Sequence, residues 1–432
     1  MTIPQVRHDA GMGTRGSHPA GLYVLFFTEL AERYSFYTLM GLLTLYMDEV
    51  LRLPETTSAQ IYGGFVGAVY LVPLLGGIIG DRWLGCYRTV LVGSVLMTAG
   101  QLLVASSGVG PFFGGLALLA CGTGLLKPNI WAMVGRLYHD RPQLRDAGCN
   151  IFYMGVNIGA AAGPVAASWF RHRYGWPAAF LSAAVAMVVA ASIFIAFRRH
   201  LAAGVRRERV ADTEACPLKP APDERARILA LPVVFAVVMV FWLAFYQNGY
   251  ALTLWARDNT VTAVSPEVFQ AVDPLGIILF SLPLVALWSA LRRRHVEPST
   301  VGKITIGMLL TSATFGIMTV AALAGGDTGR VSPGWLVSAY LLIAVGEICL
   351  SPMGLSLVTK VAPRRFAATM VGGWFAAASI GGYLAGFLGT YWGTMPHSRF
   401  FLVIAGLSLA AAAVLAGVRK RLSPVLTAAG DA

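Results

Sequence analysis

The sequence predicts an all-α protein that crosses a membrane many times, and three observations support this prediction. The 432-residue chain is 56% hydrophobic and only 12% charged, which is about half of the charged share of a soluble protein. Its mean hydropathy is +0.66, because apolar runs of roughly 20 residues recur, the length with which a helix crosses a bilayer core of about 30 Å. Its basic residues also fall mostly into alternate loops. A soluble globular protein is therefore excluded.

Hydropathy, turn residues and charges together place twelve membrane helices in the chain. The predicted spans are 21–47, 58–80, 87–107, 110–138, 144–170, 175–198, 228–255, 269–291, 301–325, 332–359, 366–392 and 399–418. With both termini in the cytoplasm, 25 of the 33 basic residues lie on the cytoplasmic side and six lie outside, while Arg33 and Lys127 lie within helices. Cytoplasmic loops carry such an excess of basic residues. The net charge of +12 is therefore topological, and no nucleic-acid partner is expected.

The longest cytoplasmic segment divides the chain into two halves of six helices. The predicted order is a tail over 1–20, a bundle over 21–199, a linker over 200–227, a bundle over 228–422 and a tail over 423–432. The linker contains several Pro and Arg residues and little apolar pattern, so a flexible connection is one interpretation and a basic strip on anionic lipid is another. In six-plus-six architectures, the first and fourth helices of each half commonly face a shared cavity.

Five ionisable side chains lie deep within predicted membrane helices, where charges are costly and functional by default. Glu29, Glu32 and Arg33 share one face of the first helix because their spacings are i,i+3 and i,i+4. Lys127 lies in the fourth helix and Glu347 in the tenth. Three acids and two bases are neutral when about one proton is bound, which indicates a proton-coupled carrier. The alternative is that these groups form static ion pairs that hold helices together.

Several short motifs follow one another along the predicted helices. They are Glu29-x-x-Glu32-Arg33-Tyr34-x-x-Tyr37, Gly77-x-x-x-Asp81-Arg82-x-x-Gly85-x-x-Arg88, Gly122-Thr123-Gly124 with Lys127-Pro128-Asn129, Phe152-Tyr153 with Asn157, Phe241-Trp242, Gly346-Glu347 with Ser351-Pro352, and Gly373-Trp374-Phe375. Together they resemble the proton-dependent oligopeptide transporter (POT) family, a branch of the major facilitator superfamily. The matches run from the first to the eleventh predicted helix.

This resemblance implies proton-driven uptake of di- and tripeptides by alternating access of the two bundles. It implies that Glu29, Glu32 and Arg33 couple transport to protons. It also implies that eight side chains line the substrate cavity: Arg33, Tyr37, Tyr70, Lys127, Asn157, Glu347, Ser351 and Trp374. The two cations suit the carboxylate of a zwitterionic peptide, and Asn157 and Glu347 suit its ammonium group. The walls formed by Tyr70 and Trp374 tolerate variable side chains.

Some of these residues have a second interpretation. Tyr37 and Tyr70 could be aromatic residues of helix packing or of the membrane interface, and Trp374 could be a residue of the packed protein core. Asn157, between two glycines, suits a hydrogen bond between close-packed helices. Lys127 and Glu347 suit an inter-bundle bridge that a proton or a charged substrate opens.

The loop after the second predicted helix carries Asp81, Arg82 and Arg88. The resemblance implies that this loop takes part in the conformational change and not in substrate binding, and that its charges clamp the inner ends of neighbouring helices in one state.

The chain departs from the family pattern at three positions. Tyr246 stands where the seventh helix usually has an acid, and Met40 stands where the first helix often has its arginine partner, so no orphan charge remains. We therefore expect Met40 and Tyr246 to close the outer gate through apolar and hydroxyl contacts. Asp273 stands where the eighth helix usually has asparagine. It suits a ligand for a substrate ammonium group, a second proton site or a helix N-cap.

The sequence indicates no cofactor, no metal site and no enzyme active site. Its five cysteines form no Cys-x-x-Cys pair, and its seven histidines lie in loops or near helix ends. The N-terminus lacks the pattern of a signal peptide. We expect a multi-pass protein of the cell inner membrane that works as a monomer, with a small peptide, protons and the lipid bilayer as partners. The alternatives are a proton-coupled carrier of another small organic solute or anion, and a non-transporting receptor or sensor.

Overall fold

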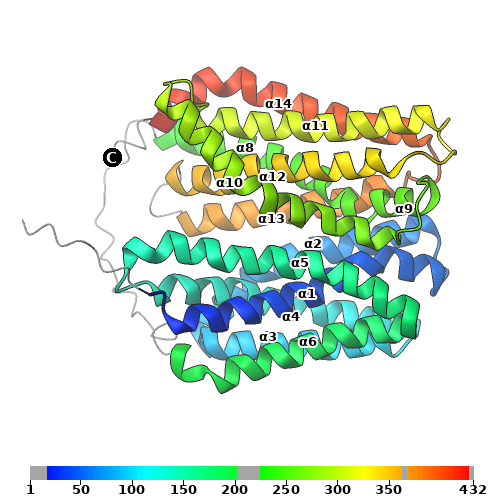
Figure 1. Ribbon diagram of the computed structural model, residues 1–432. Helices are drawn as coiled ribbons and strands as arrows, with labels where there is room; N and C mark the ends of the chain where they lie inside the picture. Colours follow the sequence, from blue (N-terminus) through cyan, green and yellow to red (C-terminus); the bar gives the residue numbers. More distant parts are fainter. Residues whose placement is uncertain (1–16, 202–223, 362–366, 428–432) are drawn as a thin grey trace, which may run out of the picture.

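The computed structural model describes residues 17–201, 224–361 and 367–427, and these form two bundles of roughly parallel helices (Figure 1). The first bundle contains α1 (Ala20–Glu49), α2 (Glu55–Ile79), α3 (Cys86–Ala105), α4 (Val109–Leu137), α5 (Arg145–Tyr174) and α6 (Trp176–Ala196). The second contains α8 (Glu224–Phe245), α9 (Ala251–Asp258), α10 (Val272–Arg293), α11 (Thr300–Ala324), α12 (Pro333–Val361), α13 (Ala367–Gly389) and α14 (His397–Thr427). The predicted all-α class is confirmed.

Short helical turns connect or extend these helices. They are η1 (Gly80–Leu84), η2 (Pro142–Leu144), η3 (Arg198–Leu201), η4 (Tyr246–Gly249) and η5 (Pro266–Ala271). The seventh predicted span is covered by α8, η4 and α9 in succession, and the eighth by η5 and α10.

Eleven helical segments among the described residues are long and apolar enough to cross a membrane. They correspond to all predicted spans except the first. The first is α1, which is 30 residues long but carries Glu29, Glu32 and Arg33 in its middle, and these charges lower its hydropathy. The long helix that falls short of a membrane span by hydropathy is therefore the one that carries the charged motif.

Two boundaries differ from the prediction. The last helix, α14, continues to Thr427, beyond the predicted end of that span at residue 418. The predicted linker over 200–227 lies mostly outside the described residues, which end at residue 201 and resume at 224.

Glycines allow the two bundles to approach closely along α2 and α13. A Cβ added at Gly63 would lie 2.7 Å from the Cα of Gly386. The hydroxyl of Ser379 on α13 also donates to the carbonyl of Gly67 on α2 at 2.7 Å. Small residues and interhelical hydrogen bonds are the usual means of helix association in a bilayer, where lipid removes the apolar driving force.

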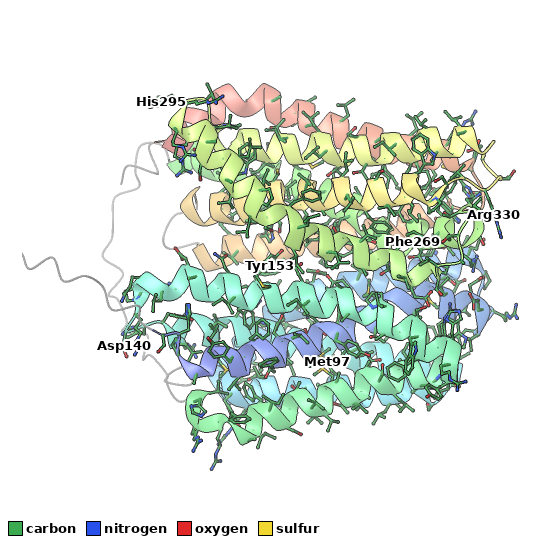
Figure 2. All side chains as sticks on the ribbon, in the orientation of Figure 1. Met97, Asp140, Tyr153, Phe269, His295 and Arg330 are labelled. Carbon is green, nitrogen blue, oxygen red and sulfur yellow. The ribbon has the colours of Figure 1, made fainter. Side chains whose placement is uncertain are left out.

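The first helix begins and the last helix ends at the same end of the molecule (Figure 1). We call this the inner end, because the sequence predicts that it is cytoplasmic, and the opposite end the outer end. In Figure 2, Asp140 and His295 mark the inner end and Arg330 marks the outer end.

Candidate functional site

The middle of α1 holds a buried ion cluster of Glu29, Glu32 and Arg33. The Arg33 guanidinium donates to both carboxylate oxygens of Glu32, and its Nε lies 3.5 Å from Oε1 of Glu29. Glu29 is 1% exposed, and its Oε2 has no hydrogen-bond partner among the described residues. Two carboxylates and one guanidinium are electrically neutral only when they hold one proton. The structure thus brings together the three residues that were predicted to couple transport to protons.

A stack of aromatic rings joins the two bundles beside Lys127. The Lys127 ammonium on α4 lies 4.8 Å from the ring centroid of Tyr70 on α2. The Tyr70 ring lies 5.5 Å from that of Tyr246 in η4 and 5.9 Å from that of Trp242 on α8, measured between centroids. The rings of Trp242 and Tyr246 stack at 5.4 Å. In this conformation the ion pairs of the described residues do not include one between Lys127 and Glu347.

Carboxyl groups of the second bundle lie near these residues. Lys127 acts electrostatically on both Glu347 on α12 and Glu29 on α1, so it lies between acids of the two bundles. Glu347 lies within electrostatic reach of Asp273 on α10, and both acids lie within reach of Tyr153 on α5. Figure 2 shows Tyr153 about midway along the molecule, where α5 faces the second bundle. Tyr153 was not predicted as a site residue, although it belongs to a motif that the sequence singled out.

Two further residues that were predicted to line the cavity lie on the first bundle. Tyr37 is half-buried on α1 and acts electrostatically with Arg33 and Tyr70. Asn157 is buried on α5, and its amide donates to the carbonyl of Tyr153 at 3.0 Å. That hydrogen bond lies within one helix, which differs from the interhelical bond considered as the alternative role of Asn157.

The last two residues that were predicted to line the cavity, Ser351 and Trp374, lie on the second bundle. Ser351 is half-buried one turn after Glu347 on α12. Trp374 on α13 is buried, and its ring is so close to α12 that a Cβ added at Gly354 would lie 2.3 Å from it. Trp374 therefore packs against the inner half of α12.

Ion pairs join the two bundles at the outer end. Arg171 at the end of α5 lies 3.1 Å from Glu267 in η5 and 3.4 Å from Glu49 at the end of α1. Arg257 on α9 pairs with Asp48 on α1. These pairs could not be predicted from the sequence, because their members are far apart in the chain and no motif links them.

Hydrogen bonds from hydroxyl groups of the first bundle also contribute to this closure. Thr44 on α1 donates to the carbonyl of Gly249 at 2.6 Å, and Tyr62 on α2 donates to the carbonyl of Tyr246 at 2.9 Å. Met40 is buried in the same apolar core as Tyr246. The Tyr246 hydroxyl has no hydrogen-bond partner among the described residues, and closure by Met40 and Tyr246 stays a prediction. The outer ends of the bundles are held together by ion pairs and by hydrogen bonds to backbone carbonyls.

The inner end carries the predicted conformational loop. Asp81 in η1 lies 3.5 Å from Arg136 at the inner end of α4, and Arg136 also donates to the sulfur of Cys86 at 3.1 Å. Arg82 and Arg88 are exposed beside this pair. An exposed ion pair contributes only about 0–1 kcal/mol, which suits a contact that forms in one state and opens in another.

Comparison with known proteins decides the family. The family model described as POT family matches residues 87–214 and 213–400, which is most of the chain. The chain belongs to the POT family.

Relatives of this POT-family chain are described as peptide transporters. It is 34% identical over 448 residues to "Peptide transporter YePEPT" of Yersinia enterocolitica subsp. palearctica, a match that covers 86% of this chain and 88% of the relative. It is 28% identical to "Dipeptide and tripeptide permease A" of Escherichia coli (strain K12), over 86% of this chain and 84% of the relative. A crystal structure of a peptide transporter POT variant in complex with alafosfalin matches with a TM-score of 0.87 and 29% identity, over 96% of this chain and 97% of that one.

These findings confirm the family that the motifs indicated and the fold that the family implies. The POT-family chain is a polytopic membrane transporter. Its predicted location in the cell inner membrane agrees with its bacterial relatives.

Proposed function

We propose that this POT-family chain imports di- and tripeptides together with protons, by alternating access of its two bundles. The observation that carries the proposal is the buried cluster of Glu29, Glu32 and Arg33, within electrostatic reach of Lys127. The names of its relatives, which are described as peptide transporters and permeases, support the substrate class.

The charges suit the two ends of a short peptide. Arg33 and Lys127 are cations on the first bundle, and Glu347 is an acid on the second. A peptide carboxylate bound to the first bundle and its ammonium bound to the second would connect both halves. Charge-assisted hydrogen bonds are roughly twice as strong as neutral ones, so such a substrate stabilises the conformation in which the bundles close around it.

The cluster on α1 supplies the site for a proton. Glu32 is held at two points by Arg33, whereas Glu29 shares only one edge of the guanidinium and has an oxygen without a partner among the described residues. The geometry therefore favours Glu29 as the acid that takes the proton. Glu32 then serves to hold Arg33 toward the cavity.

Alternating access needs contacts that differ between the two ends. In the present conformation the outer ends are joined by Arg171–Glu267 and Asp48–Arg257. Binding of a proton and a peptide from outside requires these pairs to open, and release inside requires them to re-form. Both bundles belong to one chain, which supports function as a monomer.

The test is uptake of labelled dialanine into proteoliposomes, with and without an inward proton gradient. We expect gradient-driven accumulation in the natural protein. Glu29→Gln and Glu32→Gln each remove the net negative charge of the cluster, so we expect either variant to accumulate less dialanine at the same proton gradient while it keeps counterflow exchange, because exchange needs no net movement of protons. Asp140→Asn changes an exposed acid at the inner end and serves as the control.

The outcomes separate the parts of the proposal. Accumulation in both variants equal to that of the natural protein would remove the coupling role of the cluster, and so would equal loss of exchange and accumulation. Failure of the folded natural protein to take up dialanine would favour another small solute. Tyr246 and Asp273 are the two departures from the family pattern that support this second candidate.

A further inference from the structure

Asp273 is a buried acid that has no ion-pair partner among the described residues. It lies in the first turn of α10, is 5% exposed, and has an oxygen, Oδ1, without a hydrogen-bond partner among the described residues. The N-cap position of α10 is Ala271, which makes no side-chain capping hydrogen bond. The arrangement therefore does not support the capping role that the sequence allowed. A helix N-terminus stabilises a negative charge by only about 0.3–1 kcal/mol, which is less than burial of an unpaired carboxylate costs.

The groups that face Asp273 from neighbouring helices are acids and phenols. Glu347 on α12 acts on Asp273 as a like charge, and its Oε2 also has no hydrogen-bond partner among the described residues. The phenols of Tyr340 on α12, Tyr37 on α1 and Tyr153 on α5 all lie within electrostatic reach of Asp273. None of these groups supplies a positive charge.

Lys127 is the cation that acts on the acid pair, and it acts on Glu347. The groups that act on Asp273 do not include Lys127. One lysine and two carboxylates are neutral only when they hold one proton. This is a separate requirement from that of the α1 cluster, so the two groups together are neutral with two protons bound.

We propose that Asp273 and Glu347 together bind a second transported proton, which enters from outside and travels with the substrate. The inference rests on the proposed function and deepens it. The proton is held on Asp273 while Glu347 stays ionised to receive the substrate ammonium group. The substrate and this proton are both released at the inner end. The carrier then moves two protons with each zwitterionic peptide.

The first test measures the number of protons for each dialanine in proteoliposomes with the membrane potential clamped at zero. Each coupled proton multiplies the equilibrium accumulation by about ten for a tenfold proton gradient. We expect about 100-fold accumulation for the natural protein and about tenfold for Asp273→Asn, which keeps the shape of the side chain and removes its proton site. Asp140→Asn makes the same change at an exposed position of the inner end, and we expect it to retain the accumulation of the natural protein. Equal accumulation by the natural protein and Asp273→Asn overturns the proposal.

The second test does not depend on transport. Infrared difference spectra recorded across a pH step report carboxylic acid groups through their C=O band. We expect Asp273→Asn to lack one such band that the natural protein and Asp140→Asn both show, and an unchanged spectrum overturns the proposal. If Asp273→Asn does not fold, Asp273→Ser takes its place in both measurements. If the natural protein does not transport dialanine, the proposed function fails, but the infrared result still decides whether Asp273 and Glu347 bind a proton.

Discussion

We expect Glu267→Gln to weaken the closure of the outer end. The Glu267 side chain is 0% exposed and lies 3.1 Å from Arg171 on the other bundle. Removal of one partner from a buried ion pair costs about 3–5 kcal/mol. Arg171 keeps a second partner, Glu49, at 3.4 Å, so we expect a smaller effect of about 1.5–3 kcal/mol, as for a hydrogen bond to a charged group. The pair joins the bundles only when the outer ends are together. The loss of about 1.5–3 kcal/mol therefore shifts the equilibrium between the closed and the open outer end by about tenfold to a hundredfold toward the outward-open state.

Double electron–electron resonance measures this shift directly. Spin labels at Tyr174, at the outer end of α5, and Leu323, at the outer end of α11, lie on opposite bundles at exposed positions. The five native cysteines are first replaced by serine. We expect the distance distribution of Glu267→Gln to gain a population with longer separations than the parent protein.

Glu49→Gln is the matched control because it removes the other acid that pairs with Arg171. The Glu49 side chain is 40% exposed, and exposed ion pairs contribute only about 0–1 kcal/mol. We expect a much smaller shift for this variant. If Glu267→Gln leaves the distances unchanged, or if the two variants shift the distances equally, burial of the Glu267 pair does not control the outer closure.

Two further predictions concern packing and pH. Gly63→Ala would place a Cβ 2.7 Å from the backbone of α13, whereas Gly64→Ala meets nothing within 4 Å. We therefore expect the first to destabilise the protein by about 1–3 kcal/mol and the second to be neutral or stabilising, as measured by thermal unfolding in detergent, and equal midpoints would contradict the close approach of α2 and α13. The second prediction concerns pH. Hydrogen bonds from Arg292 and Lys303 lower the pKa of Glu297, in the loop after α10, to about 2. This pKa lies below the ordinary value of 4.5. The ionised Glu297 carboxylate therefore stabilises the folded protein fully above pH 4.5, and this stabilisation is lost as the pH falls from 4.5 toward about 2. The difference in unfolding midpoint between the natural protein and Glu297→Gln should therefore shrink over that interval, and a constant difference would contradict the prediction.

The helices and the charged residues of α1 could be predicted from sequence because each depends on local information. Apolar runs of membrane length fix where helices lie, and the i,i+3 and i,i+4 spacings bring Glu29, Glu32 and Arg33 to one face of any helix. The alternation of basic loops gave the number of crossings. The motifs added the family, which the comparison confirmed.

The outer ion pairs could not be predicted in this way. Asp48 and Arg257 are separated by 209 residues, and Arg171 and Glu267 by 96. The sequence marks these residues only as charges near helix ends, which is where most charges of a membrane protein lie. Their pairing depends on how the two bundles meet, and hydropathy carries no information about that contact.

The sequence by itself determined that this protein is a helical membrane carrier with a charged first helix, because burial in lipid restricts which residues a span can contain. Only the tertiary structure decided how those charges are arranged between bundles. It placed Lys127 on the ring of Tyr70 and within reach of acids on both sides, and it placed Asp273 beside Glu347 with no cation of its own in the described part of the chain. The physical reason is that the electrostatic interaction of two groups depends on their distance and on the dielectric around them, and both are set by the packing of helices that are remote in sequence.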